Sequence, residues 1–196
     1  MSRFIETIRI EDGRIHNLPY HNRRMDVTRR NVLHQIGTLD LSDYIRPGNY
    51  RERTKCRVEY DKDILSVDYA AYHIRPVSSL RLVVDDEVTY RYKSTDRSVL
   101  NRLFAFREAE DDVLIVRRGL LTDTSVCNVA LWNGKQWVTP SMPLLAGTMR
   151  ASLLDKGEIV ADDIRPDDLP VYSRIRLFNA MIEFGEIEFP VDRIVL

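Results

Sequence analysis

The sequence predicts an α+β chain of two lobes, and three observations support this prediction. Short alternating apolar runs, typical of strands, recur along the whole chain, and helical spacing of apolar residues interrupts them in a few places. The length of 196 residues suffices for one large domain or two small lobes. A hydrophobic fraction of 44% is that of an ordinary globular protein. We expect a smaller N-terminal α/β lobe over 1–88, a larger mixed β/α lobe over 89–196, and a ligand cleft between them.

The first lobe is predicted to be a small antiparallel sheet with one helix. Apolar residues alternate weakly over 3–10, and Asp12-Gly13 favours a tight hairpin turn into a returning strand at 15–18. After Pro19 the apolar spacing becomes helical and ends at Gly37. The apolar positions of this helix are Met25, Val32, Leu33 and Ile36, and further strands are predicted at 55–60, 64–72 and 80–90.

The second lobe is predicted to begin with a helix that Ser94 or Thr95 caps and that runs to about residue 107. A later helix follows Gly147 and ends at Gly157, since glycine commonly terminates helices. Asn133-Gly134 is a strong hairpin signal. The charged stretch 161–169 is predicted to be a loop, and strands are predicted at 111–116, 129–138, 174–184 and 187–196.

Composition excludes several classes of protein. The two cysteines, Cys56 and Cys127, lie in no CxxC or Cys/His cluster, which argues against a disulfide scaffold or a metal site and fits a reducing compartment. The N-terminus MSRFIETIRIEDGR is charged throughout and does not resemble a signal peptide. Apolar runs fall short of the roughly 20 residues that a membrane span needs. We therefore expect a cytoplasmic protein with no membrane partner.

Charge is unevenly distributed along the chain. Residues 1–60 hold 12 Lys/Arg against 8 Asp/Glu, whereas residues 151–196 hold 5 against 10. The densest basic run, HNRRMDVTRRNV at 21–32, could meet a nucleic acid or an anionic small molecule such as a phosphate ester. Asp26 interrupts this run and the last third of the chain is acidic, which argues against nucleic acid. A binding module without catalysis remains the alternative from another class.

A polar segment, LTDTSVCN at 121–128, separates two apolar runs, VLIV at 113–116 and VALW at 129–132. Polar residues between strands commonly form a turn. They can equally face a bound ligand, so this segment by itself leaves both interpretations open.

Four segments taken in order resemble the class IV pyridoxal-phosphate enzymes. They are HNRR at 21–24, Lys93 before a helix, TDTSVCN at 122–128 and AGTMR at 146–150. The opening FIETIRIEDGR is similar to the ETIR strand and DG hairpin of that family. The family includes branched-chain and D-amino-acid aminotransferases and 4-amino-4-deoxychorismate lyase. The resemblance implies pyridoxal 5'-phosphate as cofactor and covers most of the chain with gaps.

The resemblance implies roles for individual residues. Lys93 matches the lysine that carries the cofactor and moves the substrate proton, and is the catalytic candidate. Arg24 matches the arginine of HxxR, which grips the cofactor phosphate. Asp123 stands where the family usually has glutamate, a carboxylate that pairs with the pyridine nitrogen. The other cofactor-binding candidates are Ser125 and Asn128 as pocket lining, Thr148 and Met149 as amide donors at a helix start, and Asn179 as a phosphate contact.

Two short motifs favour a lyase within the family. GTMR and FNAM, at 147–150 and 178–181, are closer to the lyase GIMR and CNAL segments than to the aminotransferase GITR and GTAAEV segments. The resemblance thus implies cleavage of a small anionic amino substrate into 4-aminobenzoate and pyruvate, in folate biosynthesis, by a homodimer. An aminotransferase acting on branched-chain or D-amino acids is the alternative. A non-catalytic family remnant is another, because the first lobe is shortened relative to the family.

Overall fold

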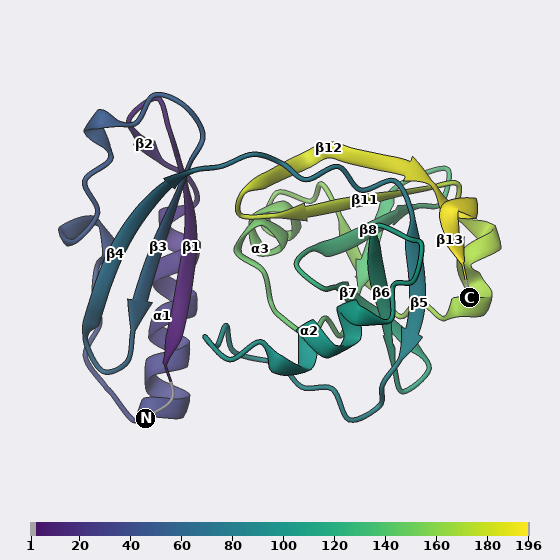
Figure 1. The fold of residues 1–196 in the computed structure, drawn as a ribbon, viewed down its shortest axis with the longest axis horizontal. Helices are drawn as coiled ribbons and strands as arrows, with labels where there is room; N and C mark the ends of the chain where they lie inside the picture. Colours follow the sequence, from purple (N-terminus) through teal and green to yellow (C-terminus); the bar gives the residue numbers. More distant parts are fainter. Residues whose placement is uncertain (1–2, 196) are drawn as a thin grey trace. The chain divides into compact units, whose positions relative to one another are not determined.

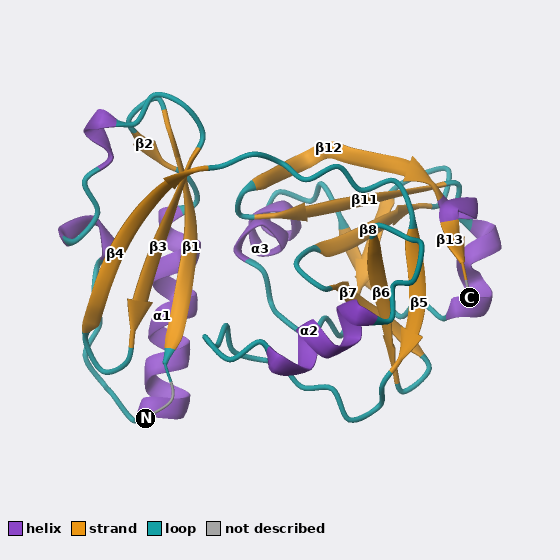
Figure 2. Ribbon diagram, in the orientation of Figure 1, coloured by secondary structure: helices purple, strands orange, loops and turns teal. Residues whose placement is uncertain are grey.

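A computed structural model describes residues 3–195, which form two compact units (Figure 1). Unit 1 comprises the chain up to Ile74 together with Tyr92–Asp96, and unit 2 comprises Arg75–Arg91 and the chain from Arg97 onward. The sequence predicts a boundary between the two lobes at residues 88 and 89. The predicted lobes also include Met1, Ser2 and Leu196, which lie outside the described residues. The predicted α+β class is confirmed, with sheets and helices in both units (Figure 2).

Unit 1 is an antiparallel sheet with the strand order β2–β1–β3–β4 and one long helix, α1, against it. Its bounds are β1 (Phe4–Glu11), β2 (Arg14–Ile15), α1 (Leu18–Leu33), η1 (Leu41–Asp43), η2 (Pro47–Asn49), β3 (Thr54–Tyr60) and β4 (Ile64–Ala71). The core between sheet and helix includes Ile8, Ile10, Met25 and Val58, all fully buried. Burial of these apolar side chains supplies the main driving force for the unit.

The hairpin predicted at Asp12-Gly13 is present. Both residues have positive φ, 50° and 70°, as a two-residue turn between twisted strands requires. The returning strand predicted at 15–18 is wrong, because β2 ends at Ile15. Asn17 adopts the left-handed conformation and α1 begins immediately after it.

The predicted end of α1 at Gly37 is also corrected. The helix stops at Leu33, and His34 takes the left-handed conformation and donates its backbone N–H to the carbonyl of Arg29. This is a helix-terminating turn that glycine or asparagine usually provides. Ile36 therefore lies beyond the helix and is 92% exposed instead of part of its apolar face.

Unit 2 contains two sheets, with strand orders β13–β5–β6–β7 and β10–β9–β8–β11–β12. Helix α2 packs against the first sheet and α3 against the second. The bounds are β5 (Leu80–Val84), α2 (Ser98–Ala105), β6 (Asp112–Arg117), β7 (Leu120–Thr124), β8 (Asn128–Trp132), β9 (Trp137–Pro140), α3 (Thr148–Asp155), β10 (Val160–Asp162), η3 (Pro166–Val171), β11 (Arg174–Asn179), β12 (Ile182–Pro190), η4 (Val191–Arg193) and β13 (Ile194–Val195).

The start of unit 2 departs from the sequence predictions in three ways. The strand predicted over 80–90 ends at Val84, where a turn follows at residues 86–87 and the Asp85 side chain accepts the backbone N–H of Glu87. The strand is also paired in parallel with β6 and does not extend the antiparallel sheet of unit 1. Neither Ser94 nor Thr95 caps α2, which begins at Ser98.

The hairpin and helix signals of the second half are confirmed. Gly134 has a φ of 90°, and the Asn133 side chain accepts the backbone N–H groups of residues 135 and 136. Helix α3 follows Gly147, and Gly157 ends it in the left-handed conformation. The loop predicted at 161–169 is corrected in part, since β10 pairs in parallel with β9 and η3 follows.

Candidate active site

Unit 1 places one carboxylate, one imidazole and one guanidinium in direct contact. Glu6 lies on β1, and His21 and Arg24 lie one turn apart on α1. The Nε–H group of Arg24 donates to Glu6 Oε1 at 2.9 Å, and a terminal guanidinium nitrogen donates to Oε2 at 2.5 Å. His21 Nδ1 lies 2.6 Å from the same Oε2. The side chains of Glu6 and His21 are fully buried, whereas that of Arg24 is 14% exposed.

The charge states of this group follow from its contacts. Burial alone would raise the pKa of Glu6, but the positive charge of Arg24 and the hydrogen bonds from His21 and Arg24 lower it to about 2. Burial lowers the pKa of His21, and the charges of Arg24 and Lys93 act in the same direction against the opposing effect of Glu6. Glu6 is therefore ionised at neutral pH. A neutral imidazole can donate to it only from Nδ1, which fixes the tautomer.

Lys93 belongs to the same unit. Its backbone carbonyl accepts the N–H of Ile5, and the next residue, Ser94, bridges Phe4 in antiparallel fashion, so the segment lies beside β1. Lys93 is half-buried. Its positive charge acts on His21, which places its amine in the electrostatic neighbourhood of the Glu6 group. The structure thus brings two of the predicted residues, Lys93 and Arg24, to one region of unit 1.

Asp123 is the buried carboxylate of unit 2. It lies on β7 and is 5% exposed. Its Oδ1 accepts from Asn128 Nδ2 at 2.8 Å, and its Oδ2 accepts the backbone N–H of Leu145 at 2.8 Å. Burial raises the pKa of Asp123 to about 6, although these hydrogen bonds and the charge of Arg150 act in the opposite direction. A cationic partner beside this carboxyl group would lower its pKa and favour the ionised form.

Asn128 connects Asp123 to the loop before α3. Its Nδ2 donates to Leu145 O at 3.0 Å as well as to Asp123. Its Oδ1 lies so close to Gly147 that a Cβ on that glycine would be 1.9 Å away. The φ of Gly147 is −68°, so close approach and not backbone strain requires glycine here. Asn128 thus holds Asp123 and the 145–147 loop together; its predicted contact with the cofactor remains a prediction.

The raised pKa of Asp123 predicts a pH-dependent stability. The folded chain holds this proton more tightly than the unfolded chain, in which the pKa is about 3.8, so its contribution falls as pH rises from about 4 to about 6. In urea unfolding of the cofactor-free chain, the stability of wild type relative to Asp123→Asn should drop by up to about 3 kcal/mol between pH 4 and pH 7. A difference that stays constant over this range would contradict the assignment.

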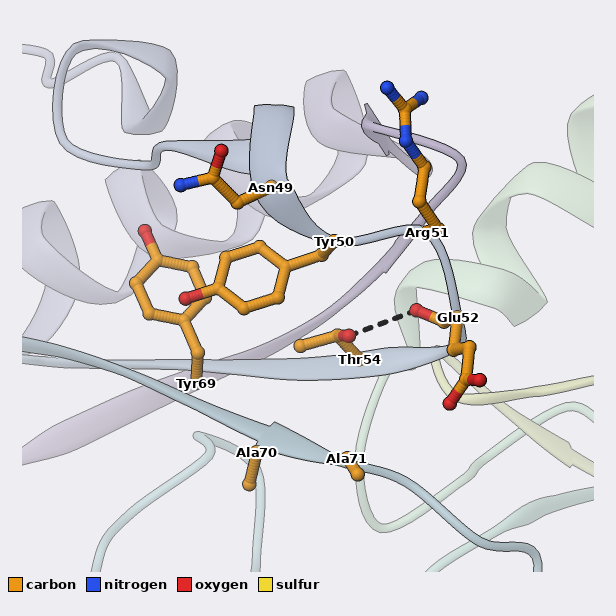
Figure 3. A pocket seen from close by; sticks show the side chains of 8 residues that line it. All are labelled: Asn49, Tyr50, Arg51, Glu52, Thr54, Tyr69, Ala70 and Ala71. Carbon is orange, nitrogen blue, oxygen red and sulfur yellow. Dashed lines mark hydrogen bonds between the residues drawn. The ribbon is translucent and has the colours of Figure 1, made fainter.

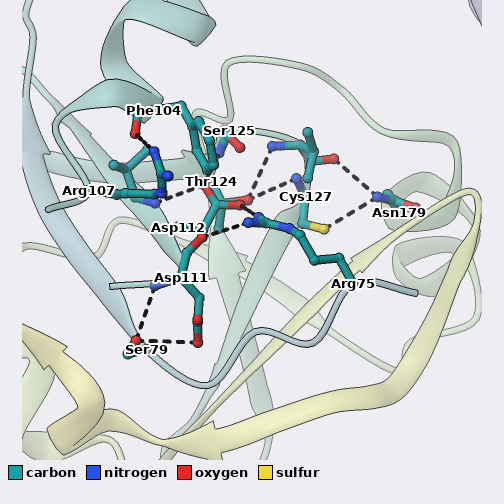
Figure 4. A network of polar contacts seen from close by, with 12 residues as sticks. Arg75, Ser79, Phe104, Arg107, Asp111, Asp112, Thr124, Ser125, Cys127 and Asn179 are labelled. Carbon is teal, nitrogen blue, oxygen red and sulfur yellow. Dashed lines mark hydrogen bonds and ion pairs between the residues drawn. The ribbon is translucent and has the colours of Figure 1, made fainter. Parts of the chain in front are cut away.

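A second buried carboxylate, Asp112, contacts the polar segment 121–128 at Ser125 (Figure 4). Its Oδ1 accepts the backbone N–H of Val113 at 2.8 Å and that of Ser125 at 3.4 Å, and Arg75 reaches its Oδ2 at 3.2 Å. Burial raises the pKa of Asp112. Ser125 itself is 5% exposed, and its carbonyl accepts from Arg97. The predicted pocket residue Ser125 is therefore fixed at its backbone on two sides.

Truncation of Asp112 should destabilise the protein more than isosteric replacement. Asp112→Ala leaves the backbone N–H groups of Val113 and Ser125 without this acceptor, which costs about 1–3 kcal/mol per buried group. Asp112→Asn keeps an acceptor oxygen and should lose clearly less. Urea denaturation of both variants checks this ordering, and equal losses would show that the acceptor at this position does not matter.

The remaining predicted residues also lie in unit 2. Thr148 is 3% exposed and begins α3, whose first turn carries no acidic residue. Met149 packs its side chain against the core around Leu153 and Phe178. Asn179 donates to Val126 O and Cys127 Sγ and accepts the backbone N–H groups of residues 181 and 182. Asn179 thus ties the β11–β12 turn to the polar segment, and its phosphate contact remains a prediction.

Cysteine chemistry does not contribute to this site. Burial raises the pKa of both thiols, Cys56 and Cys127, to about 12, so neither is a thiolate at neutral pH. Within residues 3–195, His, Cys, Asp and Glu side chains form no group of three or more that could hold a metal ion.

An open cavity of about 410 Å³ lies elsewhere in unit 1, beside η2 and the ends of β3 and β4 (Figure 3). Tyr50 and Tyr69 stack at its wall with ring centroids 4.7 Å apart. Its other lining residues are Asn49, Arg51, Glu52, Thr54, Ala70 and Ala71. None of the residues predicted to bind the cofactor lines it, so this cavity does not locate the active site.

Three features of this chemistry were missed by the sequence analysis. They are the carboxylates of Glu6 and Asp112 and the close approach at Gly147. Glu6 had a usable signal, because it shares one face of β1 with the apolar Phe4, Ile8 and Ile10. A charged residue on a strand face whose other residues are apolar and buried needs an ion-pair or hydrogen-bond partner.

Comparison with known proteins identifies the family. Residues 49–188 match the amino-transferase class IV family. A solved structure of a proposed 4-amino-4-deoxychorismate lyase from Haemophilus somnus is 33% identical, with a TM-score of 0.88, and the match covers 93% of this chain and 97% of that one. A proposed aminodeoxychorismate lyase of Schizosaccharomyces pombe is 27% identical over 91% of this chain and 86% of its own length.

A more distant structure shares the fold. A hypothetical aminotransferase from Mycobacterium tuberculosis in its PLP-bound form is 18% identical, with a TM-score of 0.76 over 94% of this chain and 80% of that one. The chain therefore belongs to the amino-transferase class IV family, as the sequence resemblance implied, and is an enzyme of that family. The described residues contain no helix long and apolar enough to cross a membrane.

Proposed function

We propose that the protein is a pyridoxal-phosphate-dependent lyase that converts 4-amino-4-deoxychorismate into 4-aminobenzoate and pyruvate. The observation that carries this proposal is the position of Lys93 beside β1, in the same unit as the Glu6–Arg24 ion pair. The similarity to two proposed lyases of this kind and the GTMR and FNAM segments support the lyase over the aminotransferase.

The predicted cofactor residues of each unit, taken by themselves, fit pyridoxal phosphate in their chemistry. Unit 1 supplies a primary amine, Lys93, for the aldehyde and a guanidinium, Arg24, for the phosphate. Unit 2 supplies a buried carboxylate, Asp123, for the pyridine nitrogen and the start of α3 at Thr148 for phosphate oxygens. When bound, the cofactor supplies an electron-withdrawing ring that stabilises negative charge at the substrate carbon.

The protein's own groups would then perform the proton transfers. The Lys93 amine would remove the proton from the carbon that bears the substrate amino group. The bond between the adjacent ring carbon and the enolpyruvyl oxygen would then break, and the proton would pass to the CH2 carbon of the departing enolpyruvate to give pyruvate. Asp123, which Asn128 and the backbone N–H of Leu145 hold in place, would supply the negative charge that favours a protonated ring nitrogen. The atoms of 4-aminobenzoate and pyruvate add up to those of the substrate, so no second reactant is needed.

Product analysis tests this proposal. Purified protein supplied with pyridoxal phosphate and 4-amino-4-deoxychorismate should release pyruvate and 4-aminobenzoate in equal amounts. Parallel reactions with an amino acid donor and a 2-oxo acid acceptor test the alternative. Amino-group exchange without pyruvate release would instead establish a class IV aminotransferase.

We further propose that the enzyme is a cytoplasmic homodimer, as the family resemblance implies. Sedimentation equilibrium of the purified chain, of 22.9 kDa, should give about twice this mass. A monomer at micromolar concentration would contradict the dimer without affecting the proposed chemistry.

A further inference from the structure

The Glu6–His21–Arg24 group is unusual in its position. Phe4, Glu6, Ile8 and Ile10 alternate along one face of β1, and the three apolar members belong to the core of unit 1. A fully buried carboxylate among them loses its hydration, and an apolar residue of similar size is often as stable as a buried ion pair or more so. Packing alone therefore does not explain a glutamate at position 6.

The two hydrogen bonds between Glu6 and Arg24 determine how the guanidinium of Arg24 is oriented. A guanidinium carries five N–H donors in one plane. Glu6 bonds to Nε and one terminal nitrogen, which together form one edge of that plane. The end-on edge, formed by the two terminal nitrogens, is a different edge from the one that Glu6 contacts, and the Arg24 side chain is 14% exposed.

His21 fixes Glu6 in turn. Its Nδ1 reaches Oε2, the oxygen that also accepts from Arg24, and both side chains are fully buried. His21 and Arg24 lie on α1 while Glu6 lies on β1, so the contacts lock the helix and strand in one register. Thus His21 orients the carboxylate of Glu6, and Glu6 orients the guanidinium of Arg24.

We propose that Glu6 is a positioning residue that presents the end-on edge of Arg24 to the phosphate of the cofactor, and that His21 supports Glu6 in this role. This inference rests on the proposed function, in which Arg24 anchors that phosphate. It assigns two further residues of this chain, Glu6 and His21, a role in the preference of the protein for the phosphorylated cofactor.

The test compares pyridoxal 5'-phosphate with pyridoxal, which lacks the phosphate. Cofactor-depleted protein is titrated with each compound, and the near-visible absorption band reports binding. The dissociation constant of pyridoxal divided by that of pyridoxal 5'-phosphate measures the contribution of the phosphate. Four proteins are compared: wild type, Glu6→Asp, Arg24→Lys and the double variant. Glu6→Asp keeps the negative charge but shortens the reach by one methylene, so it isolates orientation from charge.

Glu6→Asp and Arg24→Lys should each lower this ratio about tenfold or more, and the double variant should lie no lower than Arg24→Lys alone. Such non-additivity is the signature of a residue that acts through another. A Glu6→Asp ratio equal to that of wild type would overturn the inference. So would an equal drop in the wild-type and Arg24→Lys backgrounds, because Glu6 would then act independently of Arg24.

A second pair of variants covers the case in which Glu6→Asp does not fold. His21→Asn keeps an N–H donor near the Nδ1 position and should retain the ratio, whereas His21→Leu removes the donor and should lower it. Equal ratios in this pair would overturn the role of His21 and the inference with it. A wild type that shows no preference for the phosphate would instead refute Arg24 as the anchor in the proposed function.

Discussion

Lys93→Ala should abolish the shifted near-visible band that distinguishes lysine-bound from free pyridoxal phosphate, and should reduce pyruvate release by about 10²–10⁴-fold or more. The first effect follows because a covalent bond to the cofactor aldehyde requires a primary amine at this position. The second follows because general acid–base catalysis by a positioned side chain contributes about this factor. Absorption spectra and single-turnover assays measure the two effects separately.

Two control variants sharpen this test. Lys93→Arg keeps a positive charge beside the Glu6 group but cannot form the bond, so it should lose the band as completely as alanine. Lys135→Ala changes an exposed lysine in the β8–β9 hairpin and should retain both band and activity. Persistence of the band in Lys93→Ala would remove Lys93 from the chemistry.

Gly147→Ala should destabilise unit 2 and loosen Asp123. The added Cβ would lie 1.9 Å from Asn128 Oδ1, so the asparagine must move. It is 6% exposed and can move only by giving up its bonds to Asp123 and Leu145. We expect a loss of about 1–3 kcal/mol in the free energy of unfolding, typical of overpacking in a tightly packed site.

A matched glycine and a second-site change test the stated cause. Gly37 has open space around it, so Gly37→Ala should stay within about 0.5 kcal/mol of wild type. Asn128→Ala removes the obstructing oxygen. Gly147→Ala should therefore cost much less in the Asn128→Ala background than in wild type. Equal costs in the two backgrounds would show that the contact with Asn128 is not the cause.

Local features of the fold were predictable from the sequence because they depend on neighbouring residues. The turn at Asp12-Gly13, the hairpin at Asn133-Gly134 and the end of α3 at Gly157 need only a few adjacent side chains. Two of the errors, the returning strand at 15–18 and the end of α1, arose where Asn17 and His34 adopted a conformation usually left to glycine. His34 ends α1 three residues before Gly37, in the left-handed conformation that glycine adopts more readily than any other residue.

The candidate site was predictable in part. The family resemblance pointed to Arg24, Lys93 and Asp123, and the structure buries or half-buries each of them. The supporting contacts could not be predicted, because each joins residues far apart in the sequence. Glu6 meets Arg24 across 18 positions, and Asn128 meets Gly147 across 19. Such pairs depend on strand register and helix placement, which one sequence does not specify.

Chemical trapping tests the central claim, that Lys93 holds the cofactor, most directly. Protein incubated with pyridoxal phosphate is treated with borohydride, which converts a reversible bond between lysine and aldehyde into a stable amine, and is then digested and analysed by mass spectrometry. The sequence contains four other lysines as internal controls, Lys55, Lys62, Lys135 and Lys156. The predicted result is stoichiometric modification of the peptide that contains Lys93 alone. Modification centred on another lysine, or an unmodified Lys93 peptide, would contradict it.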